Sequence, residues 1–292
     1  MTVRTLILKT AGINCDEELA HAFRLAGSEA EIVHINELVR GEKRLRDYHI
    51  LGFPGGFSYG DDLSAGRVLA TEVRARLLGE LLRFYDDGGL IIGICNGFQT
   101  LVKAGLLPDI SLLKSQPEAP SRVTLFWNDS GRFECRWVTL RVEPSSRCVW
   151  TQGLPRLIEL PVAHAEGKFI PANDKVLEEL VEKGQVVLRY CRAVDSDRCL
   201  HEQVPFPWNP NGSVGNVAGI CDPSGRVFGL MPHPERFIYS TNHPRWTRRV
   251  AGGKFSPEGV SIGVGEAGGW TDGLPFFKNA VEWVREREGI LA

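Results

Sequence analysis

Apolar residues in this chain fall into short runs bounded by turn residues, and such runs predict buried strands. Four of them lie in the first third of the sequence, at residues 3–9, 31–35, 48–53 and 90–94. Each run is too short for a helix of ordinary length. Between the first two runs, apolar positions recur at helical spacing until Gly27 ends the pattern. Strands and helices that alternate with short connections predict a parallel α/β sheet flanked by helices.

The pattern changes in the middle of the chain, which is rich in β-forming residues. Threonine, valine, phenylalanine and tryptophan dominate there with little helical periodicity, at residues 122–128, 132–143 and 157–163. This composition favours antiparallel strands added to the parallel core over about residues 120–170. After this region, helical and strand patterns of apolar residues alternate again. They predict a helix at 174–184 followed by strands at 185–191, 216–221 and 226–231.

The last fifty residues are harder to interpret. Glycine-rich residues from about 240 to 272 predict a long irregular loop, and such loops in compact chains are usually functional or mobile. Phe277, Val281 and Val284 then mark one face of a closing helix. We expect the 292 residues to form a single domain, which their number allows.

Composition excludes several classes of function. The formal net charge is −2 and no basic stripe is present, so nucleic acid is not an expected partner. No apolar run reaches the length of a membrane span, and residues 3–9 are too short and too charged for a signal peptide. The seven cysteines form no Cys-x-x-Cys pair. Their odd number and scattered spacing argue against a metal site or a disulfide framework and favour a reducing cytoplasm.

One cysteine follows the fourth predicted strand directly and lies in a glycine-rich turn. Gly93 and Gly97 flank Cys95, and the pattern over residues 96–104 predicts a helix. A sharp strand-to-helix turn is the geometry of a nucleophile elbow, here with sulfur in place of oxygen. A free thiol has a pKa of about 8.5, and the partial positive charge at a helix N-terminus favours the reactive thiolate. The alternative is a buried small apolar residue, as most free cysteines are.

Two other stretches have both a structural and a functional interpretation. Gly55 and Gly56 follow the third predicted strand, at the end where open α/β sheets bind ligands. They fit an ordinary tight turn, or a pair of backbone N–H groups that hold the oxyanion of an acyl intermediate on Cys95. His164 and Glu166 lie next to a glycine, and they fit a surface turn as well as a functional pair.

A histidine lies between two prolines at the end of the last predicted strand. Pro232 and Pro234 disfavour helical backbone before them, so we expect an extended segment around His233. Residues two apart then point to the same side, which places Glu235 beside one ring nitrogen of His233. A carboxylate that orients a histidine base is the third member of a catalytic triad.

Several of these stretches recur together in one known family. They lie in a fixed order within residues 3–238, at 54–61, 93–99, 128 with 132–133, 163–167, 209–213 and 231–236. In this order the chain resembles the class I glutamine amidotransferases. Within them it is similar to the glutaminase components of phosphoribosylformylglycinamidine synthases, which act in purine biosynthesis. The Phe-Ser-Tyr-Gly-Asp, Asn-Pro-Asn-Gly-Ser and Met-Pro-His-Pro-Glu-Arg stretches are the most specific ones.

The resemblance implies a flavodoxin-like class I glutaminase fold, with a mostly parallel sheet flanked by helices and an added antiparallel region. It implies Cys95 as the nucleophile, His233 as the general base and acid, and Glu235 as the residue that orients His233. The other residues it implies are Gly56 and Asn96 at the oxyanion hole, and Gly55, Phe57 and Gln99 in contact with glutamine.

The resemblance also implies partners. Glutamine would be the substrate, and a separate synthase subunit would use the ammonia to convert formylglycinamide ribonucleotide to formylglycinamidine ribonucleotide. ATP and magnesium would be bound by that subunit, with no cofactor on this chain, which lacks a Gly-x-x-x-x-Gly-Lys-Ser/Thr loop. A small bridging subunit often completes such complexes. Two departures from the small bacterial form are Ser64, near which that form usually has a basic residue, and the longer stretch 240–272, for which partner docking is our hypothesis.

Two other functions remain open at this point. A different Cys-His hydrolase of the same fold, such as a γ-glutamyl hydrolase, would act on glutamyl peptides without a partner. A binding module with a decayed site would have no activity. The complete set of Cys95, His233 and Glu235 argues against decay, and the stretches specific to purine biosynthesis argue against the other hydrolases.

Overall fold

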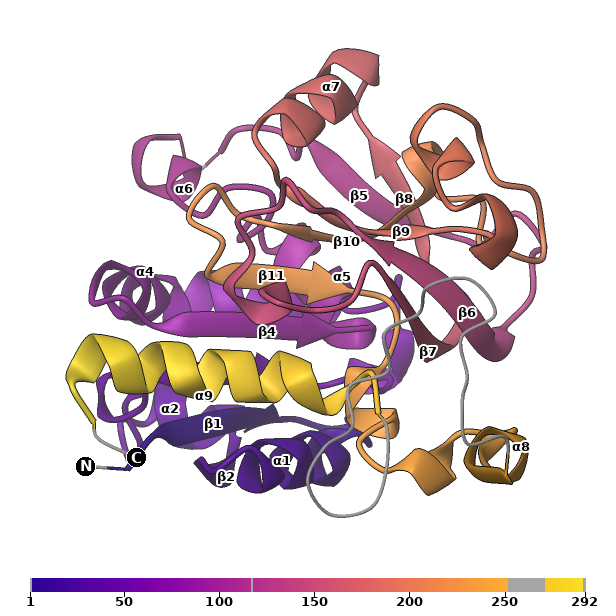
Figure 1. Ribbon diagram of the computed structural model, residues 1–292. Helices are drawn as coiled ribbons and strands as arrows, with labels where there is room; N and C mark the ends of the chain where they lie inside the picture. Colours follow the sequence, from indigo (N-terminus) through magenta and orange to yellow (C-terminus); the bar gives the residue numbers. More distant parts are fainter. Residues whose placement is uncertain (1, 117, 252–270, 291–292) are drawn as a thin grey trace.

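The computed structural model describes residues 2–116, 118–251 and 271–290 of the chain (Figure 1). Its strands are β1 (Arg4–Lys9), β2 (Glu29–His34), β3 (Ile50–Phe53), β4 (Leu90–Ile94), β5 (Val123–Phe126), β6 (Glu134–Val142), β7 (Leu157–His164), β8 (Lys168–Pro171), β9 (Val186–Tyr190), β10 (Val217–Cys221) and β11 (Val227–Leu230). Its α-helices are α1 (Asp16–Leu25), α2 (Ile35–Val39), α3 (Arg67–Glu72), α4 (Leu78–Asp86), α5 (Asn96–Lys103), α6 (Leu112–Ser115), α7 (Asp174–Glu182), α8 (Trp246–Ala251) and α9 (Leu274–Glu288).

Half of the main sheet is parallel. Strands β2, β1, β3, β4 and β11 lie side by side in that order and run in one direction. Every residue of β3, β4 and β11 is buried, as expected for strands that are covered on both faces. With β11 in fifth place, the order corresponds to the flavodoxin-like arrangement. The parallel α/β sheet predicted from the apolar runs is confirmed.

The other half of the sheet is antiparallel. Strands β10, β9, β6 and β7 continue from β11, and each runs opposite to its neighbour. Strands β5 and β8 form a separate two-stranded ribbon, and β5 packs against α5. The antiparallel addition predicted for the middle of the chain is therefore confirmed: β6 and β7 extend the main sheet, and β5 and β8 pair separately.

Helices cover both faces of the parallel half (Figure 1). Helices α1 and α9 pack together on one face, and α3 and α5 pack together on the other. Apolar residues at helical spacing, Leu69, Val73, Leu77, Leu81 and Phe84, are buried along α3, a π-helical turn at Val73–Leu77 and α4. Helix α9 buries Phe277, Val281 and Val284, as its spacing predicts. None of the helices in the described ranges is both long and apolar enough to cross a bilayer.

The stretch from 240 to 272 is only partly described. Its first residues form a 3-10 turn at Ser240–Asn242 and then α8, so the expectation of irregular structure is wrong for this part. Residues 252–270, which carry most of the predicted loop, lie outside the described residues. Both ends of the stretch meet β7 at Glu159. His243 Nε2 lies 3.2 Å from the Glu159 carboxylate, and the Asp272 carboxylate accepts a hydrogen bond from the Glu159 backbone N–H.

Candidate active site

The candidate site forms where three neighbouring parallel strands end. Strands β3, β4 and β11 are adjacent and parallel, so their carboxyl ends lie at one edge of the sheet. The glycine pair follows β3, Cys95 follows β4, and the segment with His233 follows β11. The sheet order therefore brings together three stretches that are far apart in the sequence, at the edge where such sheets bind ligands.

Cys95 lies in a strained turn between β4 and α5. Its backbone has φ 52° and ψ −105°, which is unusual for a residue with a side chain. Its N–H donates a hydrogen bond to the carbonyl of Leu230 at the end of β11, which fixes the turn to the neighbouring strand. A Cβ on Gly97 would lie 2.0 Å from the Phe53 carbonyl oxygen, so glycine is required for the close approach of α5 to β3. The predicted nucleophile elbow has this geometry.

His233 and Glu235 are joined by a short contact in a buried position. The ring Nδ1 lies 2.5 Å from Glu235 Oε1, and both residues are at most 2% exposed. His233 has extended backbone as expected, with φ −107° and ψ 90°, but the extended segment ends there because Pro234–Arg236 form a 3-10 turn. Pro234 stands at the first position of that turn, where its fixed φ is favourable. The turn brings the carboxylate back to the ring, so the predicted pairing is present with a different backbone.

The electrostatics of this group favour a protonated His233. Burial by itself lowers the pKa of the ring. The negative charges of Glu235 and Cys95, together with the hydrogen bond to Glu235, outweigh burial and raise the pKa of His233 to about 10. A protonated imidazole beside a sulfur stabilises the thiolate, which is the nucleophilic form.

Gly55 packs directly against His233 and Cys95, whereas Gly56 packs against residues 12–14. A Cβ on Gly55 would lie 2.8 Å from His233 Cε1 and 3.5 Å from Cys95 Cβ, so a side chain there would displace the ring. Gly56 has φ 139°, which favours glycine, and pairs with Ile13 in an isolated β-bridge. The turn therefore has a packing role at the site, because Gly55 lies between the cysteine and the histidine.

Cys15, just before α1, is a second cysteine close to His233 and Glu235. The sequence pattern placed it among the apolar positions of a helix and gave no sign of this contact. Its Sγ accepts a hydrogen bond from the Arg236 guanidinium at 3.0 Å. Burial and the nearby Glu235 carboxylate raise the pKa of the Cys15 thiol well above its usual range. Within the described ranges, Cys15, His233 and Glu235 are the one group whose ligand atoms lie close enough for a metal ion. The guanidinium beside Cys15 and the contact between His233 and Glu235 disfavour a cation there.

A cavity of about 370 Å³ opens beside Cys95. Its walls come from the segment after β3, from the start of α5 and from the turn after β7, and they include Gly56, Phe57, Cys95, Gln99 and Ala163–Glu166. Asp61, Asp62 and Glu166 also line it, whereas its described lining contains no lysine or arginine. The cavity is therefore rich in carboxylates at its walls and suits a ligand that carries an ammonium group.

The other predicted contact residues hold the cavity together. Asn96 accepts a hydrogen bond from the Ser58 N–H and donates to Asp61 and Gln99, so it fixes the segment after β3. Gln99 donates to the Glu166 carbonyl at 2.6 Å, which fixes the turn after β7. Phe57 is half-exposed at the cavity, where its ring lies near that of Phe133. Asn96 and Gln99 thus connect opposite walls of the cavity.

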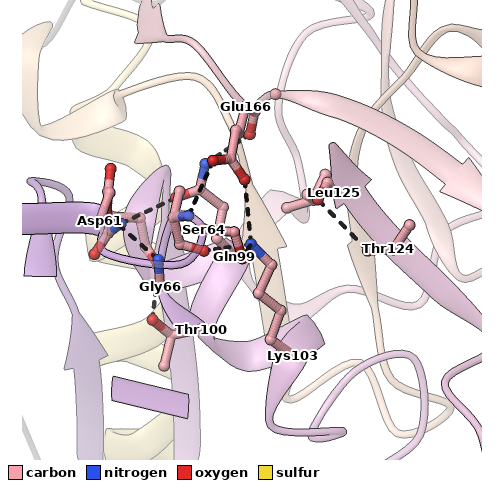
Figure 2. A network of polar contacts seen from close by, with 12 residues as sticks. Asp61, Ser64, Gly66, Gln99, Thr100, Lys103, Thr124, Leu125 and Glu166 are labelled. Atoms are coloured by element: carbon pink, nitrogen blue, oxygen red, sulfur yellow. Dashed lines mark hydrogen bonds and ion pairs between the residues drawn. The ribbon is translucent and has the colours of Figure 1, made fainter. Parts of the chain in front are cut away.

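Lys103 completes this network, and the sequence analysis did not find it (Figure 2). Its ammonium donates to Ser64 Oγ and the Ala65 carbonyl, and it lies 3.3 Å from a Glu166 oxygen. The other Glu166 oxygen accepts the Ala65 N–H. Both charged side chains are only 7% exposed. The signal was available in the spacing, because Asn96, Gln99 and Lys103 fall on one face of a helix.

The comparisons with known proteins concern nearly the whole chain. Residues 2–284 match the CobB/CobQ-like glutamine amidotransferase domain. The chain is 49% identical over 284 residues to the phosphoribosylformylglycinamidine synthase subunit PurQ of Dehalococcoides mccartyi, with 97% of this chain and 98% of the relative covered. It is 41% identical to the PurQ subunit of Methanococcus maripaludis, with 96% and 97% covered.

A solved structure supports the same assignment. A chain of the PurLQS structure from Thermotoga maritima superposes with a TM-score of 0.67 and 30% identity, covering 97% of this chain and 100% of that one. The match therefore includes the strands and turns that form the candidate site, as well as the antiparallel half of the sheet. The family resemblance inferred from the sequence motifs is confirmed, and the chain belongs to the CobB/CobQ-like glutamine amidotransferases.

Proposed function

We propose that this chain is the glutaminase subunit of a phosphoribosylformylglycinamidine synthase. It hydrolyses glutamine to glutamate and supplies ammonia to a synthase subunit, which converts formylglycinamide ribonucleotide to formylglycinamidine ribonucleotide in purine biosynthesis. The observation that carries this proposal is the pairing of His233 with Glu235 close to Cys95, which lines a cavity, in a chain 49% identical to a PurQ subunit over nearly its full length. We treat residues 1–292 as one glutamine amidotransferase domain, since the family match spans residues 2–284.

The proposed chemistry starts from a thiolate and imidazolium pair. The Cys95 thiolate attacks the side-chain amide carbon of glutamine, and the backbone N–H groups of Gly56 and Asn96 hold the oxyanion. His233 gives its proton to the amide nitrogen as the C–N bond breaks, which releases ammonia and leaves a thioester. His233 then takes a proton from water, whose oxygen attacks the thioester. Glutamate leaves, and the proton on His233 restores the pair. Glu235 keeps the ring oriented throughout.

The cavity supports an amino-acid substrate. Gly55, Phe57 and Gln99 are the proposed contacts for glutamine, and two of the three line the cavity. Asp61 supplies a negative charge at the same walls, and the α-ammonium group of glutamine complements it. Glu166 carries its charge opposite Lys103, so it is already neutralised. Asp61 and Asp62 are therefore the carboxylates that we expect to face the α-ammonium group.

The partner carries the rest of the reaction. We propose that the synthase subunit binds ATP and magnesium and that a small third subunit bridges the two, as the PurLQS assembly of Thermotoga maritima suggests. The described residues of this chain provide one cavity beside Cys95, and its size and acidic lining do not suit a nucleotide. We also propose that the chain acts in the cytoplasm. Its seven cysteines are all free, which is compatible with a reducing environment.

Glutamate release from glutamine is the direct test. The purified chain is assayed alone, with the synthase subunit of the same organism, and as Cys95→Ala. Turnover that rises with the partner and disappears in Cys95→Ala is the expected result. An assembled complex that forms product from free ammonia but never from glutamine would overturn the proposal. Turnover of γ-glutamyl peptides without a partner would instead identify a hydrolase of the same fold.

A further inference from the structure

The Asn-Pro-Asn-Gly-Ser stretch at residues 209–213 has no part in the chemistry described so far, although it is among the most specific stretches of the sequence. Its polar side chains, those of Asn209, Asn211 and Ser213, are at most 2% exposed. None of its five residues, all of which are described, lines the cavity that contains Cys95. Any effect of the stretch on the reaction therefore passes through the residues that it holds.

The side-chain amide of Asn211 binds the turn after β7. Its oxygen accepts hydrogen bonds from the Ser213 N–H at 3.0 Å and from the Ser213 hydroxyl at 2.7 Å, which fixes the orientation of the amide. The amide nitrogen donates to the Gly167 carbonyl at 2.8 Å and to the Tyr190 hydroxyl at 3.2 Å. The donors and acceptors of this side chain are thus all used within the protein.

Gly167 is held from two sides. Its N–H donates to the Asn128 side-chain oxygen at 3.0 Å, and its carbonyl accepts the hydrogen bond from Asn211. A Cβ on Gly167 would lie 2.4 Å from the His164 ring, so glycine is required for the turn to close. The position of the turn therefore depends on two amide side chains that come from separate segments of the chain.

The turn held in this way forms part of the cavity that contains Cys95. Residues 163–166 line the cavity. The Ala163 carbonyl oxygen lies 3.5 Å from Cys95 Sγ, and the Glu166 carbonyl accepts a hydrogen bond from Gln99 on the opposite wall. A shift of the turn would therefore move one wall of the cavity relative to the nucleophile.

We propose that Asn211 is a positioning residue for glutamine binding, because it holds Gly167 and thereby keeps residues 163–166 in place. This inference rests on the glutaminase function proposed above and assigns a role to a buried residue outside the cavity. Without the Asn211 contact, the turn is in place for only a fraction of the time, and glutamine binds that fraction. Such an equilibrium raises KM by the inverse of the fraction. It leaves kcat unchanged, because bound glutamine restores the turn.

Asn211→Asp tests this role, because it keeps the size of the side chain and removes the donor to the Gly167 carbonyl. In the assembled complex we expect KM for glutamine to rise about tenfold, with kcat within about threefold of the unsubstituted value. Asn211→Ser removes the same donor without adding a charge, and we expect a smaller rise of KM with the same unchanged kcat. A fall of kcat at unchanged KM in both variants would overturn the proposal.

Asn209→Asp is the matched control, because Asn209 is a buried amide of the same stretch. Its described hydrogen bonds go to residues 212 and 213 and to the Asn216 side chain, and they do not reach the turn after β7. We expect Asn209→Asp to lower the urea midpoint of unfolding and to leave KM for glutamine within about threefold. Equal increases of KM in Asn209→Asp and Asn211→Asp would overturn the proposal, because they would show general loosening of the stretch.

Hydrogen exchange measures the position of the turn directly. In a Cys95→Ala complex, which does not consume glutamine, Asn211→Asp should speed backbone amide exchange in peptides that span residues 163–169. Saturating glutamine should restore the protection, and exchange unaffected by the substitution would overturn the proposal. Glutamate release by the unsubstituted complex is measured first. Its absence would contradict the proposed function, whereas normal release with unchanged KM in Asn211→Asp would contradict only this inference.

Discussion

The two halves of the main sheet contribute differently to the candidate site. The parallel half holds Cys95, His233 and the glycine pair at the ends of three adjacent strands, within turns of a few residues. The antiparallel half contributes the opposite wall through the turn after β7, which contains His164 and Glu166. Reacting groups thus come from one half, and much of the substrate cavity comes from contacts between the halves.

This difference has a physical reason. In the parallel half, the strand order alone brings the reacting groups together, since each follows directly on a buried strand. The opposite wall depends on bonds between residues distant in sequence, such as Lys103 to Glu166 and Gln99 to the Glu166 carbonyl. Changes in the parallel half should therefore alter the chemistry, whereas changes in the wall should alter substrate binding and stability.

Cys95→Ala should produce the largest effect. We expect glutamate release by the complex to fall at least about 10⁴-fold, because the thioester cannot form. Synthesis from added ammonia should persist, since the partner does not need the thiol. Cys135→Ala, which removes an exposed cysteine of the antiparallel half, serves as the control and should retain glutamine turnover. Retained turnover in Cys95→Ala would contradict the division of roles.

Glu235→Gln should come next in size. The amide preserves the shape but loses the charge that holds the His233 imidazolium, and a comparable change in serine hydrolases lowers kcat by about 10⁴-fold. We expect a fall on the order of 10³-fold in kcat with a smaller change in KM for glutamine. Steady-state kinetics of the complex measure both values. A change confined to KM would assign Glu235 to substrate binding instead.

Lys103→Met tests the opposite wall. It leaves the Glu166 carboxylate buried without its partner, and breaking such a pair costs about 3 kcal/mol of unfolding free energy. We expect KM for glutamine to rise about tenfold with kcat within a few fold, because the wall moves while the reacting groups stay in place. Denaturant unfolding and kinetics measure these effects.

Glu166, which is paired with Lys103, provides a control for this substitution. The double variant Lys103→Met with Glu166→Gln should recover part of the lost stability, since it leaves no unpaired charge. Glu143→Gln breaks another buried ion pair, with Arg141, beside a different cavity. It should lower stability without raising KM. An equal rise of KM in Glu143→Gln would show that the effect of Lys103 is only general destabilisation.

The same contrast explains what the sequence could predict. The buried strands, the elbow at Cys95 and the pairing of His233 with Glu235 depend on residues close in sequence, and the structure has all three. Lys103 was missed because its partners come from distant segments, although its helix face could have indicated it. His164 was left open between a surface turn and a functional residue, and the structure shows it buried and in contact with Asn128.

The pH dependence of stability should sharpen the comparison further. The pKa of His233 is about 10 in the folded chain and about 6.5 when unfolded, so the folded state binds its proton more tightly. This contribution is complete below about pH 6.5 and is lost as the pH rises toward 10. It can change the unfolding free energy by at most about 1.4 kcal/mol for each pH unit in that range.

Glu235→Gln provides the test of that assignment. The substitution removes a main cause of the raised pKa of His233, so the decline of stability between pH 6.5 and 9.5 should become shallower. Urea unfolding at several pH values measures the slope for both proteins, and the difference between the slopes isolates His233 from other titrating groups. Lys103→Met changes the partner of Glu166 in the opposite wall and leaves Glu235 in place, so it should leave the slope nearly unchanged. If both substitutions reduced the slope of unfolding free energy against pH equally, the raised pKa of His233 would depend on the whole cavity and not on the parallel half alone.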